Sequence, residues 1–334
     1  MTLAAPLTPV GHAATLAELR ALWAGGRGPR TLLFAGPEGV GRRHAARWLA
    51  AYVNCARQAE APGEDPYEAP CLECESCRLM LAGTHPDFKE VSPALTTATG
   101  RAKRSLEIRI EQLVPREGGE PEPLGPWLLT RPRYNVRVGV IDHADAMNAP
   151  AANSLLKLLE EPPAWALIVL VASGPEAVLP TVASRSSVVR FRPLSEADLV
   201  AALPTVDRDH PAFRLGQPGA LLSAEAVDAA DGPDVGRAAA DELLAALTED
   251  LSATLAAAEA FGAALGGAMS GAASGGPGGP GPLAWLRHGL RAYEPTRYAA
   301  ALDAVERCEE ALAHYAQAPL AATVLALELR RVLA

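Results

Sequence analysis

The most restrictive feature of the sequence is a glycine-rich loop between an apolar strand and an amphipathic helix. Residues 31–36 (TLLFAG) have the length and composition of a buried strand, and residues 44–53 (HAARWLAAYV) carry apolar side chains at helical spacing. The connecting residues 36–43 read GPEGVGRR. A strand, a glycine loop and a helix in this order form the frame of a phosphate-binding P-loop, which predicts a parallel α/β domain.

The loop lacks the two side chains that bind MgATP in a working P-loop. There a lysine reaches the terminal phosphates and a serine or threonine hydroxyl holds magnesium, whereas this chain has Arg42 and Arg43. Arginine is a bulky planar cation, and it cannot replace a hydroxyl ligand. We therefore predict a degenerate nucleotide site without hydrolysis. Binding without turnover stays open, because the backbone amides of the loop can still hold a phosphate. Its residues are Gly36, Gly39, Gly41, Arg42, Arg43 and Asp142.

Asp142 belongs to that site because it ends an apolar run, residues 136–141 (VRVGVI). An acid at the end of such a strand holds magnesium in nucleotide hydrolases, and the next residue is normally a glutamate that activates water. Here the next residue is His143, so the catalytic base is also missing. The alternative is that Asp142 only caps a helix over residues 144–149.

Four of the five cysteines lie close together in the sequence, which favours a metal site over disulfides in a reducing compartment. Four thiolates complete a closed tetrahedral shell, so we predict a structural zinc ion. Free thiols and an iron–sulfur cluster are the alternatives. We expect the nearby His85 to be a loop or strand-edge residue, and the role of Cys308 stays open. The predicted zinc ligands are Cys55, Cys71, Cys74 and Cys77.

Composition limits the classes of protein that the chain can represent. With 334 residues, 49% hydrophobic and 21% charged, it is globular and long enough for two or three domains. It shows neither a charged-then-apolar leader nor an apolar run that could span a bilayer, so we expect a cytoplasmic protein with no membrane contact. A net charge of −9 argues against a chain that coats DNA by itself.

Apolar runs alternate with helical patterns in the first part of the chain and give way to Ala/Leu-rich helical patterns after residue 194. We predict an α/β domain over residues 1–193, a small helical lid over 194–235 and an all-helical domain over 236–334. Residues 115–126 and 266–282 are rich in proline and glycine, so we predict loops there. The predicted strands are residues 31–35, 87–91, 136–141, 166–172 and 188–191.

Residues 153–163 (NSLLKLLEEPP) carry a more specific signal. By residue type they predict only a short amphipathic helix that two prolines end. As a string they resemble the Asn-x-Leu-Leu-Lys-x-Leu-Glu-Glu-Pro-Pro signature of the AAA+ clamp-loader subunits of bacterial DNA polymerase III. Four other segments resemble that family's motifs and occur in the family's order along the chain. The resemblance covers about residues 10–220. These segments are residues 83–87 (GTHPD), 108–112 (IRIEQ), 142–148 (DHADAMN) and 184–186 (SRS).

The resemblance assigns a role to Arg185. Residues 184–186 resemble the family's Ser-Arg-Cys element, with Ser184 and Ser186 flanking the arginine. In that family the arginine reaches across a subunit interface to the γ-phosphate of a neighbour's ATP. By residue type alone Arg185 would be an ordinary surface arginine, and the resemblance implies an arginine finger that acts in trans.

The resemblance also implies an architecture and partners. It implies an AAA+ α/β domain with an inserted zinc module, a helical lid and a helical collar that joins five subunits. One family member keeps the finger and the zinc module but lacks a working P-loop, and this chain is similar to it. Its partners would be the motor ATPase subunit, the delta subunit, the sliding clamp and primer–template DNA. Residues 216–221 (GQPGAL) resemble the lid segment that often carries a nucleotide-sensing arginine, which is missing here.

Two other functions are left as alternatives. The first is an ATP-hydrolysing motor subunit of the same ring, which Arg42, Arg43 and His143 argue against. The second is a zinc-ribbon DNA-binding regulator, which the acidic balance argues against. Arg101, Lys103, Arg104 and Arg109 form a basic run that could face DNA, a partner or solvent.

Overall fold

The protein divides into two compact units, described here from a computed structural model. The first, called the α/β unit, ends at Ala202, and the second, called the helical unit, begins at Leu203. The structure describes residues 7–24, 28–60, 68–93, 107–115, 122–204, 208, 210–219, 221, 235–269, 281–313 and 316–333.

The α/β unit is built on a five-stranded sheet in which all neighbouring strands are parallel, in the order β2-β3-β4-β1-β5. The predicted parallel α/β class and all five predicted strands are confirmed, with ends that shift by one residue at most. Every residue of β1 and β4 is buried, as expected for parallel strands covered on both faces. The strands are β1 (Thr31–Ala35), β2 (Phe88–Val91), β3 (Arg137–Ile141), β4 (Ala166–Ala172) and β5 (Ser187–Arg190).

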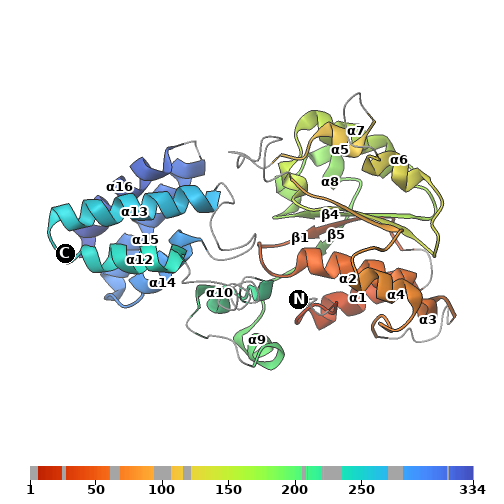
Figure 1. The fold of residues 1–334 in the computed structure, drawn as a ribbon, viewed down its shortest axis with the longest axis horizontal. Coiled ribbons are helices and arrows are strands. Elements are labelled where there is room, and N and C mark those ends of the chain that lie inside the picture. The colour runs from red at the N-terminus through yellow and green to blue at the C-terminus, as the bar shows by residue number, and fades with distance from the viewer. Residues whose placement is uncertain are drawn as a thin grey trace. The chain divides into compact units, whose positions relative to one another are not determined.

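Helices cover both faces of this sheet (Figure 1). On one face lie α1 (Ala13–Ala24), α2 (Arg42–Asn54), α3 (Ala56–Glu60) and α4 (Glu75–Leu81). On the other lie α5 (Ile110–Leu113), α6 (Leu124–Leu129), α7 (Ala149–Glu160) and α8 (Pro180–Ala183). Adjacent residues of a strand point to opposite faces. Accordingly Phe34 packs into one buried cluster with Trp48, and Leu33 into the other with Leu155.

The remaining elements of the α/β unit are short. They are η1 (Ala144–Ala146), η2 (Pro175–Ala177) and α9 (Glu196–Ala202). Ser195 caps α9, since the backbone N–H of Asp198 donates to its Oγ over 3.1 Å.

Two expectations about local structure are wrong in this unit. The predicted loop over residues 115–126 ends earlier, because α6 begins at Leu124, and residues 116–121 lie outside the described part. Pro126 is accommodated because it lies in the first turn of α6, where a backbone N–H has no helical partner. Asp142 does not cap a helix over residues 144–149. That stretch holds the 3₁₀ turn η1, which follows His143, and α7 is capped by Asn148.

Every element described in the helical unit is a helix, as predicted for the chain after residue 194. A single buried cluster, which includes Leu243, Phe261, Trp285 and Leu325, joins the long helices. They are α12 (Val235–Ala246), α13 (Leu251–Met269), α14 (Pro282–Leu290), α15 (Pro295–Ala313) and α16 (Ala318–Leu333), preceded by the short α10 (Pro211–Arg214).

The predicted linker over residues 266–282 begins too early. Helix α13 continues to Met269, and residues 270–280 lie outside the described part. Gly262 of α13 allows a close helix contact, because a Cβ atom there would lie 2.7 Å from Cα of Pro319 in α16. A Cβ atom at Gly266 would make only an ordinary contact, 3.8 Å from Cβ of Ala318, so the glycines that begin the predicted linker simply lie near the end of a helix.

The lid stays a prediction. The unit boundary falls inside residues 194–235, and most of the residues after 204 in that stretch are not described.

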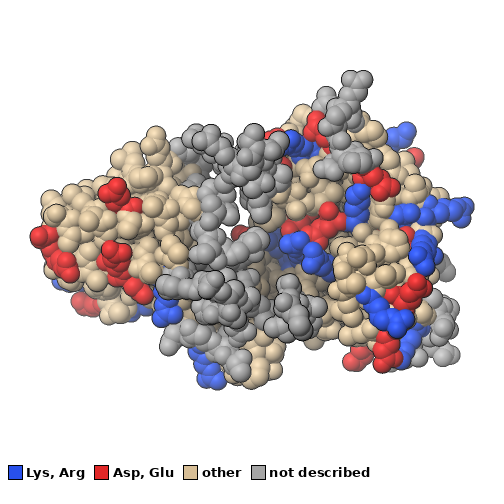
Figure 2. Space-filling model, in the orientation of Figure 1, with Lys and Arg blue, Asp and Glu red and all other residues tan. Residues whose placement is uncertain are grey.

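No described helix is both long enough and apolar enough to cross a membrane. On the face drawn in Figure 2, basic and acidic side chains of the described residues are interspersed over the α/β unit and form no continuous basic stripe.

Candidate functional site

The glycine loop has the backbone of a P-loop and lies at the carboxyl end of β1. Gly39 and Gly41 have φ angles of 75° and 103°, in the left-handed region that favours glycine. Gly36 is required for a different reason, since a Cβ atom there would lie 2.2 Å from the carbonyl oxygen of Phe191. Helix α2 begins at Arg42, directly after Gly41. The predicted strand–loop–helix frame is thus confirmed.

Arg42 occupies the lysine position with a buried, internally bonded side chain. Only 8% of the residue is exposed, and its Nη1 donates to the carbonyl oxygen of Ala172, the last residue of β4. Burial lowers the pKa of Arg42, while Asp145, Glu38 and Asp142 raise it, and the group remains a cation. Its guanidinium is therefore committed to the end of a neighbouring strand rather than to a ligand in the loop.

Arg43 occupies the hydroxyl position and pairs with acids from two strands. Its Nε lies 3.5 Å from Oδ2 of Asp142, which follows β3, and also pairs with Oε1 of Glu90 in β2. Arg47, one turn further along α2, contacts Oε2 of Glu90 at 2.9 Å through both Nε and Nη2. Two arginines and two carboxylates thus form a charge-balanced group, the Arg43 cluster. Glu90 and Arg47 were not predicted from the sequence.

The acid that would hold magnesium is already engaged. Besides its contact with Arg43, Asp142 accepts the backbone N–H of His143 through Oδ1 at 3.1 Å. His143 has a φ angle of 54° and follows Asp142 where a hydrolase would carry its glutamate. Asp145 is also bonded, since its Oδ2 accepts from Oγ of Ser173 at 3.0 Å. A cation, a backbone amide and a hydroxyl of the chain itself therefore satisfy the acids next to the loop.

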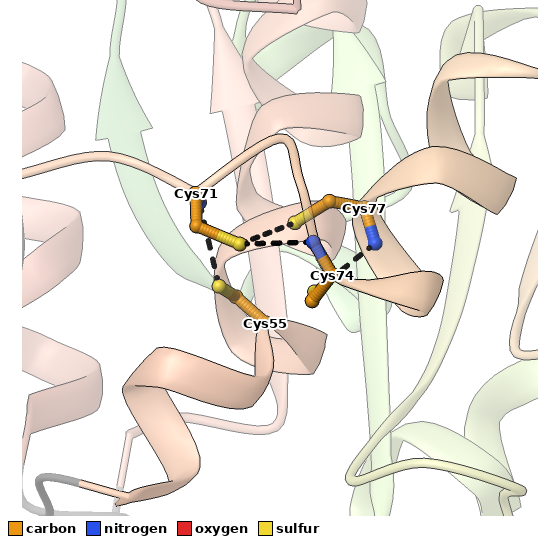
Figure 3. A group of neighbouring side chains, drawn as sticks. All are labelled: Cys55, Cys71, Cys74 and Cys77. Carbon is orange, nitrogen blue, oxygen red and sulfur yellow. Dashed lines mark hydrogen bonds between the residues drawn. The ribbon is translucent and has the colours of Figure 1, made fainter.

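The four clustered cysteines come together in space, as Figure 3 shows. Their sulfur atoms all lie within 4.8 Å of one another. Cys55 follows the last residue of α2, Cys74 caps α4, and Cys77 lies in the first turn of α4. Four sulfurs placed tetrahedrally at about 2.3 Å from zinc would lie about 3.8 Å apart, so the cluster fits a zinc ion.

Backbone amides orient the sulfurs of the cluster. The N–H of Cys71 donates to Sγ of Cys55 at 3.4 Å, that of Cys74 to Sγ of Cys71 at 3.3 Å, and that of Cys77 to Sγ of Cys74 at 3.4 Å. Burial raises the pKa of Cys55 and of Cys77. Burial also acts to raise the pKa of Cys71, but the amides of Cys74 and Glu73 outweigh it and lower the value to about 6. One thiolate is therefore favoured even without metal.

His85 lies outside the group of four sulfurs and has a structural role. It is 5% exposed, and its Nε2 lies 3.0 Å from Oγ of Ser76 while its Nδ1 accepts the N–H of Asp87. Asp87 is fully buried and accepts the N–H groups of Arg133 and Tyr134. This network ties the cysteine module to the start of β2.

Arg185 lies between α8 and β5 with its side chain one-third exposed. Its Nε and Nη2 donate to Oε1 of Glu160 at 2.8 and 2.5 Å, and its Nη1 donates to the carbonyl oxygen of Thr181 at 2.9 Å. Ser184 and Ser186 bond backbone carbonyls within the same turn, so they shape the turn. Glu160 is a contact that sequence reasoning missed.

The predicted basic run is only partly described. Arg101, Lys103 and Arg104 lie outside the described residues. Arg109 precedes α5, and its N–H donates to Oε1 of Gln112 at 2.9 Å.

The predicted lid segment, residues 216–221, is described except for Ala220. It begins after α10 at Gly216, which has a φ angle of 66°.

Comparison with known proteins identifies the family. A family model described as the DNA polymerase III delta subunit matches residues 11–195, more than half of the chain. The DNA polymerase III subunit delta′ of Pseudomonas aeruginosa is 34% identical over 170 residues, which cover 50% of this chain and 45% of that protein. The delta′ subunit of Escherichia coli K12 is 31% identical over 213 residues, covering 62% and 57%.

A gamma/tau subunit is also related. That of Mycobacterium tuberculosis H37Rv is 30% identical over 197 residues, which cover 59% of this chain and 30% of the relative. The chain spans about half or less of the length of the first curated relatives that it matches. The family model spans the motifs that carried the clamp-loader resemblance; it starts just before α1 and ends just before α9. The chain therefore belongs to the DNA polymerase III delta-subunit family, and its resemblance to the delta′ subunit of the AAA+ clamp loader is confirmed.

Proposed function

We propose that this chain is a non-catalytic subunit of the bacterial DNA polymerase III clamp loader. In this role it helps to open the sliding clamp and load it onto primer–template DNA, and it completes a neighbour's ATP site with Arg185. The observation that carries the proposal is a division of labour between two arginine sites. The glycine loop carries Arg42 and Arg43 where a working P-loop has its lysine and hydroxyl, and Arg42 is buried and bonded to Ala172. Arg185, by contrast, lies at the surface with one-third of its side chain exposed.

The glycine loop argues against the alternative of a motor subunit. ATP hydrolysis needs a lysine on the phosphates, a hydroxyl on magnesium and a residue that activates water. The corresponding positions hold Arg42, Arg43 and His143, and Asp142 already contacts Arg43. We therefore expect no ATPase activity from the isolated chain. The DNA-binding regulator is disfavoured by the net charge of −9 and by the mixed charges on the face in Figure 2.

The other parts of the chain take supporting roles in this proposal. A zinc ion held by the cysteine cluster would join the end of α2 to α4, and zinc would supply structural stability there. Residues 236–334 would form the collar through which the chain joins the motor ATPase and delta subunits in a cytoplasmic hetero-pentamer. Residues 194–235, which come before the collar in the sequence, would form the lid.

The test is DNA-stimulated ATP hydrolysis by the reconstituted ring. With Arg185→Ala we expect turnover at the neighbouring site to fall by about 10³-fold, the lower range for loss of an arginine finger. Arg185→Lys should also be slow, because lysine keeps the charge but lacks the planar fork. The matched control is Arg190→Ala, an exposed arginine five residues further on, which should leave turnover unchanged.

Two outcomes would reject the proposal. Rapid hydrolysis by the isolated wild-type chain would favour the motor alternative. Unchanged turnover of a correctly assembled ring with Arg185→Ala would remove the trans-acting role and leave a scaffold. Salt-sensitive duplex binding by the isolated chain would instead support the DNA-binding regulator.

A further inference from the structure

The guanidinium of Arg185 is held from two sides. On one side Oε1 of Glu160 accepts both Nε and Nη2, at 2.8 and 2.5 Å. On the other side Nη1 donates to the carbonyl oxygen of Thr181 at 2.9 Å and lies 3.4 Å from Oγ of Ser184. Contacts on both edges of a planar fork fix its plane as well as its position.

Glu160 and Arg185 belong to segments that are packed into the core. Glu160 is the last residue of α7, and one residue separates Arg185 from the end of α8. Leu159, which precedes Glu160, and Val182, whose carbonyl oxygen accepts the N–H of Arg185, are buried in the same core cluster. The carboxylate and the arginine therefore keep a defined separation although they are 25 positions apart in the sequence.

Holding the fork in this way leaves donor capacity for a ligand. An arginine has five N–H groups, and the contacts with Glu160 and Thr181 use one on each of its three nitrogens. The pair lies at the surface, with 33% of the Arg185 side chain and 49% of the Glu160 side chain exposed. A phosphate oxygen brought by a neighbour can thus be met by an N–H that Nη2 still carries.

We propose that Glu160 is the positioning residue for Arg185. It holds the guanidinium in the orientation in which the fork meets the phosphate of the neighbouring subunit. This inference rests on the proposed trans-acting function of Arg185 and adds the residue that prepares it. Because exposed ion pairs are weak, the gain from Glu160 lies in orientation and not in stability of the fold.

The test compares rings that carry wild-type chain, Glu160→Ala or Glu160→Gln, with ATP hydrolysis measured over a range of ATP concentrations. Misplacing a reacting group by about 1 Å can cost 10²-fold, so Glu160→Ala should lower kcat by about 10- to 100-fold and by less than Arg185→Ala does. KM for ATP should change little, since the neighbour binds the nucleotide. Glu160→Gln keeps an oxygen that accepts N–H bonds, so it should restore most of the rate.

The chain offers a matched control in Glu161. It is the adjacent glutamate, the residue is exposed, and among the described residues its side chain forms no hydrogen bond or ion pair. Glu161→Ala should leave kcat unchanged. In the Arg185→Ala background, Glu160→Ala should have no further effect, because a positioning residue acts only through the group that it positions.

The outcomes separate the two proposals. If Arg185→Ala leaves the ring unaffected, the proposed function fails whatever Glu160 does. If Arg185→Ala slows the ring but Glu160→Ala does not, or speeds it, only the positioning role is overturned. It is also overturned if Glu160→Ala slows a ring that already lacks Arg185. Melting temperatures of each variant chain show whether a loss of rate follows a loss of folding, and Glu160→Gln decides the matter if the alanine variant unfolds.

Discussion

Nε of Arg43 lies 3.5 Å from Oδ2 of Asp142, so that the first helix after the glycine loop and the acid that ends β3 form an ion pair. In a working P-loop this is the place of the magnesium ion, between a hydroxyl on the helix and the acid on the strand. A cation of the chain itself balances the acid here. Arg43 thus supplies a positive charge at the magnesium position and lacks the hydroxyl that would bind the ion.

Arg43→Thr should destabilise the α/β unit by about 1 kcal/mol. The side chains of Asp142 and Glu90 are each only 10% exposed, and leaving such groups with fewer partners is costly. The loss is kept small because Arg43 is itself 46% exposed and Arg47 still pairs with Glu90. Urea unfolding measures the difference, with Arg192→Thr as the control at an exposed arginine. An unchanged or higher free energy of unfolding would show that the Arg43 cluster does not stabilise the unit.

Restoring the P-loop side chains should restore binding before it restores hydrolysis. In the double variant Arg42→Lys/Arg43→Thr, the lysine and the hydroxyl regain their positions on a loop whose backbone is already in place. We expect magnesium-dependent ATP binding by calorimetry, but no turnover while His143 stands in the place of the base. Adding His143→Glu should begin turnover.

Arg43→Thr alone is the control for that experiment. Arg42 would still be buried and bonded to the carbonyl oxygen of Ala172, so ATP affinity should not rise. Equal ATP binding by the wild-type chain and the double variant would mean that the arginines do not block the site.

The sheet could be predicted from the sequence because its strands are buried on both faces. The run over residues 166–172 is apolar throughout, and the structure places β4 over the same residues. The glycine loop was equally predictable, since its backbone needs glycine at fixed positions. The cysteine cluster could be found because short spacings bring successive thiolates to one point.

The ion pairs could not be predicted, because they join residues that are distant in the sequence. Glu90 is an ordinary charged residue of a strand, and only the folded arrangement, in which β2 is the edge strand beside β3, brings it to Arg47, 43 residues away. Glu160 likewise has the pattern of a residue on a helix surface, and nothing in the sequence predicts its contact with Arg185. The early start assigned to the linker at residue 266 has another cause, since glycine is only a weak helix breaker and composition alone does not show at which residue α13 ends.

The cysteine cluster should shield its thiols for as long as it holds metal. We expect one zinc per chain, released by a chelator and lost in Cys74→Ser. In the native zinc-loaded chain a thiol reagent should react slowly, and chelation should expose the four cluster thiols. Cys308 should stay unreactive until the chain unfolds, since it is 5% exposed and burial raises its pKa to about 11.

Thiol counts and metal analysis check this prediction together. Cys308→Ser should lower the count in denaturant by one and leave the native count unchanged. Fast reaction of the cluster thiols in a chain that still retains its metal would contradict a closed four-thiolate shell. Iron and visible absorbance in the purified chain would favour the iron–sulfur alternative.

The stability of the α/β unit should fall as the pH drops below about 6.5, in part through His12. Its Nε2 lies 2.7 Å from the carbonyl oxygen of Val40 in the glycine loop, so the neutral ring can donate there. Burial lowers the pKa of His12, against smaller opposing effects of the bond to Val40 and the charge of Asp198. The unfolded chain, with a histidine pKa near 6.5, then binds more protons than the folded one, and acid favours unfolding.

His12→Gln should make this pH dependence shallower, because glutamine can donate to the same carbonyl but does not titrate in this range. The measurement is the urea midpoint at pH 7.5 and pH 5.5 for both chains. Part of the slope should remain in the variant, since burial also lowers the pKa of His85. Identical slopes in the two chains would show that His12 is protonated as readily in the folded protein as in the unfolded chain.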